Sequence, residues 1–120
     1  MTGQPAATVT PADVERVARR DFPADQVAQV LALLAEYGPE DWHGEPDRVR
    51  VACLKLANGD LERLRHEVEG AKHDYRDILS PAEYPGYSKR MFHIERLPPG
   101  ERERIIEADW KQYQDWLLRP

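Results

Sequence analysis

The sequence predicts a single all-α domain of about five helices arranged around a central helical hairpin. Apolar side chains recur in steps of three and four residues over most of the chain, as they do on one face of a helix. No stretch of strand length alternates between apolar and polar residues. Proline and glycine residues divide the chain into segments of helical length. We expect residues 1–9 to be disordered and residues 10–120 to form the domain.

Two helices are expected in the first third of the chain. Thr10 is a suitable N-cap because Pro11 occupies the first helical position and Asp13 lies three residues after the cap. The helix that follows should extend over residues 11–20. A second helix should extend over residues 23–37, where a Gly-Pro pair ends it.

The middle of the chain predicts the central hairpin. Residues 46–57 are apolar on most sides, which is typical of a buried helix. An Asn-Gly turn separates them from a helix over 61–79, which Asp60 caps and whose apolar residues form one narrow stripe. A Ser-Pro pair should end that helix. Residues 84–100 should then form a loop, and a fifth helix should extend over 100–118.

Composition disfavours several classes of protein. Lys and Arg total 17 against 22 Asp and Glu, a formal net charge of −5, so we expect no nucleic-acid partner. No stretch approaches the roughly 20 apolar residues of a membrane helix, so we expect no membrane association. The single cysteine, Cys53, has no partner for an internal disulfide, and the N-terminus lacks the pattern of a secretory signal. These observations favour a cytoplasmic protein.

The sequence contains none of the common catalytic motifs. A phosphate-binding glycine loop, a dinucleotide fingerprint, a zinc-protease motif, a calcium loop and a nucleophile elbow are all missing. We therefore expect no cofactor, and we favour a non-enzymatic protein–protein interaction module. A small-ligand binder or an enzyme is the alternative.

That alternative depends on polar residues near the end of the predicted 61–79 helix. The candidate ligand-binding residues are Asp74, Arg76, Asp77, Glu83 and Tyr84. Neighbouring carboxylates can raise one another's pKa and so act as acid or base. A structural interpretation is favoured, because no nucleophile with an adjacent base is evident. In that interpretation Arg76 pairs with a carboxylate and Asp74 accepts hydrogen bonds from the backbone N–H groups of the 84–90 loop.

A divalent-metal site is a third interpretation. His66, His73 and Asp77 follow one another at intervals of seven and four residues, which places them on one face of the predicted helix. A metal site needs His or carboxylate ligands that converge from two or three positions. This face points almost opposite the apolar stripe, so a solvated surface with salt bridges is the favoured alternative.

The last third of the chain has a surplus of aromatic residues with a small basic group. The candidate partner-binding residues are Tyr84, Tyr87, Lys89, Arg90 and Trp116. Aromatic and Arg side chains are enriched at protein interfaces. We expect a protein partner, or a second copy in a homo-oligomer, to contact the 84–92 segment and the fifth helix.

Several of these residues form a recognisable set of motifs. They are Arg48-Val49, Leu54-Lys55-Leu56-Ala57, Gly59-Asp60-Leu61, Asp74-Tyr75-Arg76-Asp77 and Ala82-Glu83-Tyr84-Pro85. In this combination and order they resemble a group of small bacterial helical proteins of unassigned function. The resemblance spans roughly residues 11–118 and implies a helical, cytoplasmic protein. It implies no catalytic residue.

Overall fold

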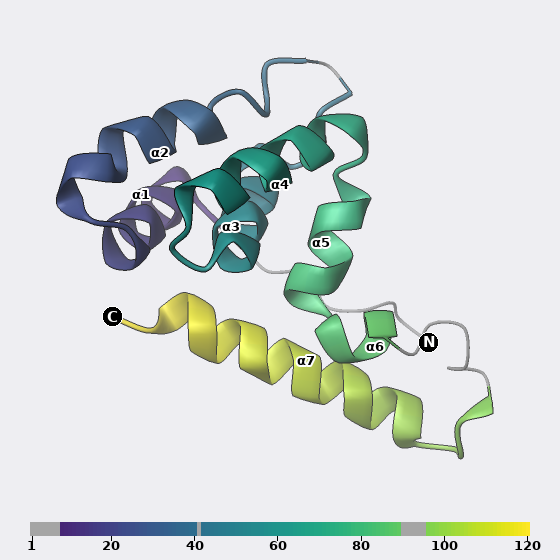
Figure 1. Ribbon diagram of the computed structural model, residues 1–120. Coiled ribbons are helices and arrows are strands. Elements are labelled where there is room, and N and C mark those ends of the chain that lie inside the picture. The colour runs from purple at the N-terminus through teal and green to yellow at the C-terminus, as the bar shows by residue number, and fades with distance from the viewer. Residues whose placement is uncertain (1–7, 41, 90–95) are drawn as a thin grey trace.

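The computed structural model describes residues 8–40, 42–89 and 96–120, and within them the chain is helical with no β-strand (Figure 1). The predicted all-α class is confirmed. The helices are α1 (Pro11–Asp21), the 3-10 helix η1 (Ala24–Gln26), α2 (Val27–Leu34), α3 (Pro46–Ala57), α4 (Leu61–His73), α5 (Arg76–Glu83), α6 (Pro85–Lys89) and α7 (Glu101–Leu118).

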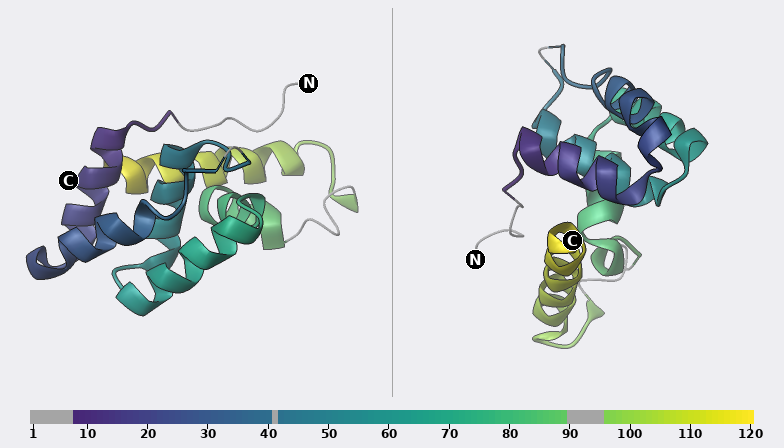
Figure 2. Two further views of the ribbon diagram at one scale, coloured as in Figure 1. Left: turned by 90° about the horizontal axis from the view of Figure 1, so that it is seen from above. Right: turned by 90° about the vertical axis from the view of Figure 1, so that its left-hand side faces the viewer.

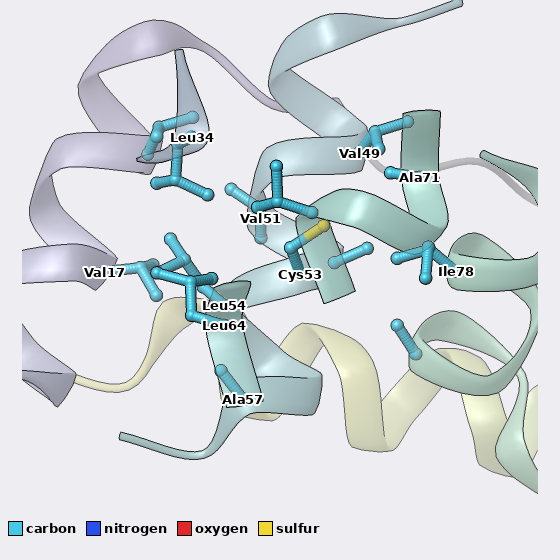
Figure 3. Packing of buried hydrophobic residues seen from close by; sticks show 14 of the residues in the cluster. Val17, Leu34, Val49, Val51, Cys53, Leu54, Ala57, Leu64, Ala71 and Ile78 are labelled. Atoms are coloured by element: carbon cyan, nitrogen blue, oxygen red, sulfur yellow. The ribbon is translucent and has the colours of Figure 1, made fainter. Parts of the chain in front are cut away.

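A single helix, α3, occupies the centre of the fold. It packs against α1, α4 and α5, and most of its apolar side chains are buried. Figure 3 shows Val51 and Cys53 among side chains from the surrounding helices, including Leu34 of α2 and Ile78 of α5. The prediction that this segment is buried is confirmed. The predicted central hairpin is only part of the arrangement, because α3 packs against α1 and α5 as well as against α4.

The predicted helix over 61–79 is wrong in its extent, because the chain breaks at Asp74. The backbone of Asp74 is extended (φ −158°, ψ 106°), and α4 ends at His73. The Asp74 carboxylate accepts a hydrogen bond from the Arg76 backbone N–H at 3.0 Å, and this bond favours a turn over continued helix. A separate helix, α5, follows and includes Pro81, which was predicted to end the longer helix.

Two further differences change the helix count from the predicted five. The second helix begins with the short η1 segment and continues as α2. The predicted loop after residue 84 contains the five-residue helix α6. Arg90 and the remainder of the predicted 84–92 partner segment lie outside the described residues.

The predicted helix starts at Thr10 and Asp60 are confirmed. The Thr10 hydroxyl accepts a hydrogen bond from the Asp13 N–H at 3.3 Å, and the Asp13 carboxylate accepts one from the Thr10 N–H at 3.0 Å. The Asp60 carboxylate accepts a hydrogen bond from the Arg63 N–H at 2.9 Å. Between α3 and α4, Gly59 has φ +81°, and a Cβ there would lie 3.0 Å from the Asp21 carbonyl oxygen. Glycine therefore lets this turn pass close to α1.

Helix α7 lies below the other helices in Figure 1, and the right-hand view of Figure 2 shows it at the same lower side. Its N-terminal half packs against α6 and its middle packs against α5. Tyr113 and Leu117 join the main apolar cluster from this side. The end of α7 near residue 118 therefore comes close to α1 and to the end of α3, and this junction contains the site described below.

Candidate functional site

The predicted ligand-binding residues belong to two separate groups. Asp74 and Arg76 pair with each other at the surface, with both carboxylate oxygens 3.0 Å from guanidinium nitrogens. The Arg76 guanidinium lowers the pKa of the Asp74 carboxyl below its ordinary value. Asp77 is exposed to solvent on the first turn of α5. The expected pairing of Arg76 with a carboxylate is thus present. The expected contact of Asp74 with the 84–90 loop is not, because Asp74 accepts from the Arg76 N–H and the N–H groups of Gly86 and Tyr87 donate to Asp109.

The second group lies inside the protein, between α3 and α5. Glu83 is 3% exposed and accepts two hydrogen bonds from the Arg48 guanidinium, at 2.7 and 2.6 Å. Arg48 also donates to Glu45 at 2.7 Å. Burial and the nearby Glu83 charge raise the pKa of the Tyr84 phenol to about 12. Glu83 is therefore committed to an ion pair within the fold and does not converge with Asp74 and Asp77 on one pocket.

The three predicted metal ligands are exposed side chains on two different helices. His66 and His73 belong to α4, whereas Asp77 follows the break at Asp74 and belongs to α5. The spacing argument assumed one continuous helix, which the chain does not form. Over residues 8–40, 42–89 and 96–120, no three His, Cys, Asp or Glu side chains are grouped as a metal site requires.

The four predicted partner-binding residues that the structure describes lie in different environments. Tyr84 is buried, Tyr87 is half-buried and Lys89 is exposed on α6. The Arg102 guanidinium lies 5.9 Å from the centre of the Tyr87 ring. Trp116 is 14 residues further along α7 than Arg102, which corresponds to about 20 Å along a helix axis. The Tyr87 ring therefore lies near the first turn of α7, whereas Trp116 lies in the last turn.

Asp109 is a structural residue that the sequence did not reveal. It is buried on α7 and accepts hydrogen bonds from the backbone N–H groups of Gly86, at 2.9 Å, and Tyr87, at 2.8 Å. A Cβ at Gly86 would lie only 2.8 Å from an Asp109 carboxylate oxygen. This close contact fixes α6 on α7. No local spacing in the sequence distinguishes this Asp from a solvent-facing one.

A surface hollow of about 540 Å³ lies where the ends of α3 and α7 meet. Its lining residues are Lys55, Asn58, Gln112, Asp115, Trp116 and Arg119. Of the predicted partner-binding residues within 8–40, 42–89 and 96–120, only Trp116 lines it. The hollow therefore combines one aromatic ring with a mostly polar and charged wall.

Arg20 of α1 positions the aromatic side of the hollow. Its guanidinium carbon lies 4.9 Å from the centre of the Trp116 ring. The same guanidinium donates to the backbone carbonyls of Trp116, at 2.7 Å, and Arg119, at 2.8 Å. Arg16 donates to the Leu117 carbonyl at 2.6 Å. These bonds add donors to the carbonyls at the C-terminus of α7, where the regular intrahelical hydrogen bonds end, so the last turn of α7 is held in place.

The uncompensated charge in the hollow is positive. Lys55 is half-buried in the last turn of α3, and burial lowers its pKa while the charge of Asp109 opposes that shift. In the described part of the chain, the Lys55 and Arg119 side chains have no hydrogen-bond acceptor or ion-pair partner. The acidic member, Asp115, binds the Lys111 ammonium at 2.9 Å. Two cations without acceptors thus lie beside an aromatic ring, in a protein whose overall charge is −5.

Sequence reasoning missed this hollow because Lys55 is surrounded by apolar neighbours in the chain, and nothing near it predicts the approach of α7.

The described helices include none long and apolar enough to cross a membrane. The resemblance to small bacterial helical proteins stays a prediction. Comparison of the chain with known protein families, with curated proteins and with solved structures found no match.

Proposed function

We propose that this protein is a non-enzymatic helical module that binds a protein partner through the hollow between α3 and α7. The observation that carries the proposal is the half-buried Lys55, which has no hydrogen-bond acceptor among the described residues and lies in a hollow that also contains the Trp116 ring. A partly desolvated ammonium without an acceptor is unfavourable, and an external acceptor relieves that cost. The hollow is open to the surface, so such an acceptor can reach Lys55 from outside.

The composition of the hollow supports a protein partner. Trp and Arg are the side chains most enriched at the centres of protein interfaces, and both line this hollow. Arg20 and Arg16 hold the end of α7, so the Trp116 ring is ordered before a partner arrives. An ordered aromatic ring loses little conformational entropy on binding.

The hollow replaces the surface that the sequence predicted. Trp116 is retained as a partner-binding residue, and Lys55 and Arg119 take the place of Lys89 and Arg90. Two of the three carboxylates of the alternative function, Asp74 and Glu83, are engaged by arginines of the chain itself, and the third, Asp77, is exposed on the first turn of α5. The enzyme and small-ligand alternatives therefore gain no support from the arrangement of these groups.

A matched pair of charge reversals tests the proposal. Arg119→Glu alters the hollow, whereas Arg104→Glu makes the same charge change on an 80% exposed side chain at the other end of α7. Each full-length variant and the wild-type chain would be immobilised and exposed to a lysate of the organism that encodes the protein. Retained proteins would then be quantified by mass spectrometry.

We expect at least one protein to be retained by the wild-type chain and by Arg104→Glu, and to fall at least tenfold with Arg119→Glu. The arginine bonds to the Arg119 carbonyl involve only the backbone, so the substitution leaves the end of α7 capped. Equal recovery by the two variants, or no retention above an empty resin, would remove the hollow as a partner site.

A further inference from the structure

Given the proposed function, on which this inference rests, we infer that the partner inserts an acidic side chain into the hollow. The partner's carboxylate binds Lys55 and Arg119, and an apolar residue next to it packs on Trp116. The occupant is thus a short acidic–apolar segment of another protein. It supplies the acceptor that the two cations lack within the described residues.

The polar groups of the wall favour an anion over a cation or a neutral amide. Asp115 is already paired with Lys111, so it does not neutralise Lys55 or Arg119. The Gln112 side-chain nitrogen donates to the Asp109 carbonyl at 2.9 Å, so this donor is also committed. The charged groups of the wall that have no partner among the described residues are the Lys55 ammonium and the Arg119 guanidinium. Charge-assisted hydrogen bonds to a carboxylate suit both.

A single carboxylate fits this position better than a phosphate group. Sites that bind phosphate commonly use backbone N–H groups at a helix N-terminus. The helix ends at this hollow are the C-terminal ends of α3 and α7, where the backbone presents carbonyl oxygens and a partial negative charge. The Arg16 and Arg20 side chains donate to carbonyls at the end of α7, but they bring no backbone N–H group to the hollow that could bind a phosphate. A monovalent carboxylate meets less repulsion here than a doubly charged phosphate.

Trp116 supplies the apolar part of the recognition. Its ring is half-buried, backed by the Arg20 guanidinium and tilted against the Tyr113 ring at a centroid distance of 5.7 Å. An aliphatic side chain that covers the remaining ring surface is removed from water. The carboxylate then sets the position of the segment, and the apolar contact adds affinity.

Two peptides that differ in one functional group test the inference. Acetyl-Leu-Glu-Leu-amide carries the carboxylate, and acetyl-Leu-Gln-Leu-amide is its neutral isostere. Each would be titrated into the ¹⁵N-labelled full chain at fixed ionic strength and followed by NMR. We expect the Glu peptide to shift the Trp116 indole N–H and the backbone signals of Lys55 and Asn58 in a saturable way. The Gln peptide should bind at least tenfold more weakly.

Protein variants locate the binding. Lys55→Met should weaken binding of the Glu peptide at least tenfold, whereas Lys89→Met, which removes an exposed charge on α6, should leave it unchanged. Arg119→Gln, at an exposed position near the end of the chain, should also weaken it and serves if Lys55→Met alters the fold. Circular dichroism would check each variant.

The outcomes separate this inference from the proposed function. Equal affinity for the Glu and Gln peptides, or no saturable shift with either, overturns the carboxylate assignment. Either result would still leave the hollow as a partner site to be tested independently by the lysate comparison of Arg119→Glu with Arg104→Glu. Sodium phosphate that shifts the same signals at lower concentration than the Glu peptide also overturns the inference, because the hollow would then be a general anion site.

Discussion

Glu83 has the least exposed charged side chain among the described residues, at 3% of its surface. Its two hydrogen bonds from Arg48 join α3 to α5, so the ion pair spans the centre of the fold. Removing one partner of such a pair leaves the other charge desolvated and without its counter-ion. Replacing Glu83 alone is therefore unfavourable, whatever the intact ion pair contributes to stability.

Glu83→Ala should lower the free energy of unfolding by about 3–5 kcal/mol, because it leaves Arg48 without its buried counter-ion. Glu45→Ala is the matched control, since it removes the other carboxylate on Arg48 from a side chain that is 56% exposed. The control should cost less than about 1 kcal/mol. Urea unfolding would measure both. Similar losses for the two variants would contradict the assignment of Glu83 as the main partner.

Tyr113 and Tyr37 differ in whether their buried hydroxyls have partners. The Tyr37 hydroxyl donates to the Gly44 carbonyl at 2.8 Å, whereas the Tyr113 hydroxyl has no hydrogen-bond partner in the described chain. Tyr37→Phe should therefore cost about 1 kcal/mol of unfolding free energy, and Tyr113→Phe should cost nothing or add up to about 1 kcal/mol. Urea unfolding would rank the two. A larger loss for Tyr113→Phe would mean that its hydroxyl is satisfied in solution.

Roles that a residue plays within its own helix were easier to predict than its contacts with distant helices. Thr10 and Asp60 were identified as caps because a cap acts on the backbone three residues away. Lys55, Glu83 and Asp109 acquire their roles from helices distant in the chain, and no local pattern records those approaches. Their partners became evident only once α3, α5 and α7 were placed together.

Among the helices, those whose ends carry strong local signals were predicted well. The predicted 46–57 range coincides with α3, where a proline begins the helix and an Asn-Gly turn ends it. The 61–79 prediction failed because the stripe of apolar residues continues past the end of α4 through Tyr75, which lies in the break, to Ile78 of α5. Periodicity reports which side chains face the core, and two helices that face the same core can continue one stripe.

The C-terminal turn of α7 depends on Arg20, and its neighbour Arg19 provides a control. Arg20 bonds the carbonyls of Trp116 and Arg119, whereas Arg19 pairs with Glu15 on a side chain that is 62% exposed. Arg20→Ala should increase amide hydrogen exchange in the last turn of α7 by tenfold or more, since charged hydrogen bonds contribute about 1.5–3 kcal/mol.

Arg19→Ala should leave exchange in that turn within a factor of about two, because surface ion pairs contribute little. Hydrogen exchange followed by NMR resolves the α7 amides from those of α1. Equal protection in both variants would show that packing of Tyr113 and Leu117, and not the cap, holds the end of the helix.

At the scale of the whole molecule, the apolar cluster draws on α1, α2, α3, α4, α5 and α7. Cys53 lies at its centre with no exposed surface. Burial, and to a lesser degree the charge of Glu67, raise the pKa of its thiol from 9.0 to about 12. Burial likewise raises the pKa of Tyr37 to about 12. Both groups lose their protons more easily in the unfolded chain than in the folded one. Their deprotonation is therefore coupled to unfolding of the core.

This linkage predicts how stability falls in alkali. Below pH 9 the Cys53 thiol keeps its proton in both the folded and the unfolded chain, so it adds no pH dependence. Between pH 9.0 and about 12 the unfolded chain loses that proton and the folded chain retains it. The unfolded state then binds fewer protons, so the free energy of unfolding falls by about 1.4 kcal/mol per pH unit for this one group.

Cys53→Ala should remove that contribution and leave those of the buried tyrosines. Its stability at pH 8 should be lower than that of the wild-type chain, because a methyl group fills less of the core than a thiol. Between pH 9.5 and pH 11, however, the loss per pH unit should be smaller in the variant by up to about 1.4 kcal/mol. Urea unfolding at several pH values measures both slopes. Parallel slopes would mean that the Cys53 thiol ionises in the folded protein as readily as in the unfolded chain, and hence that the centre of the cluster admits water.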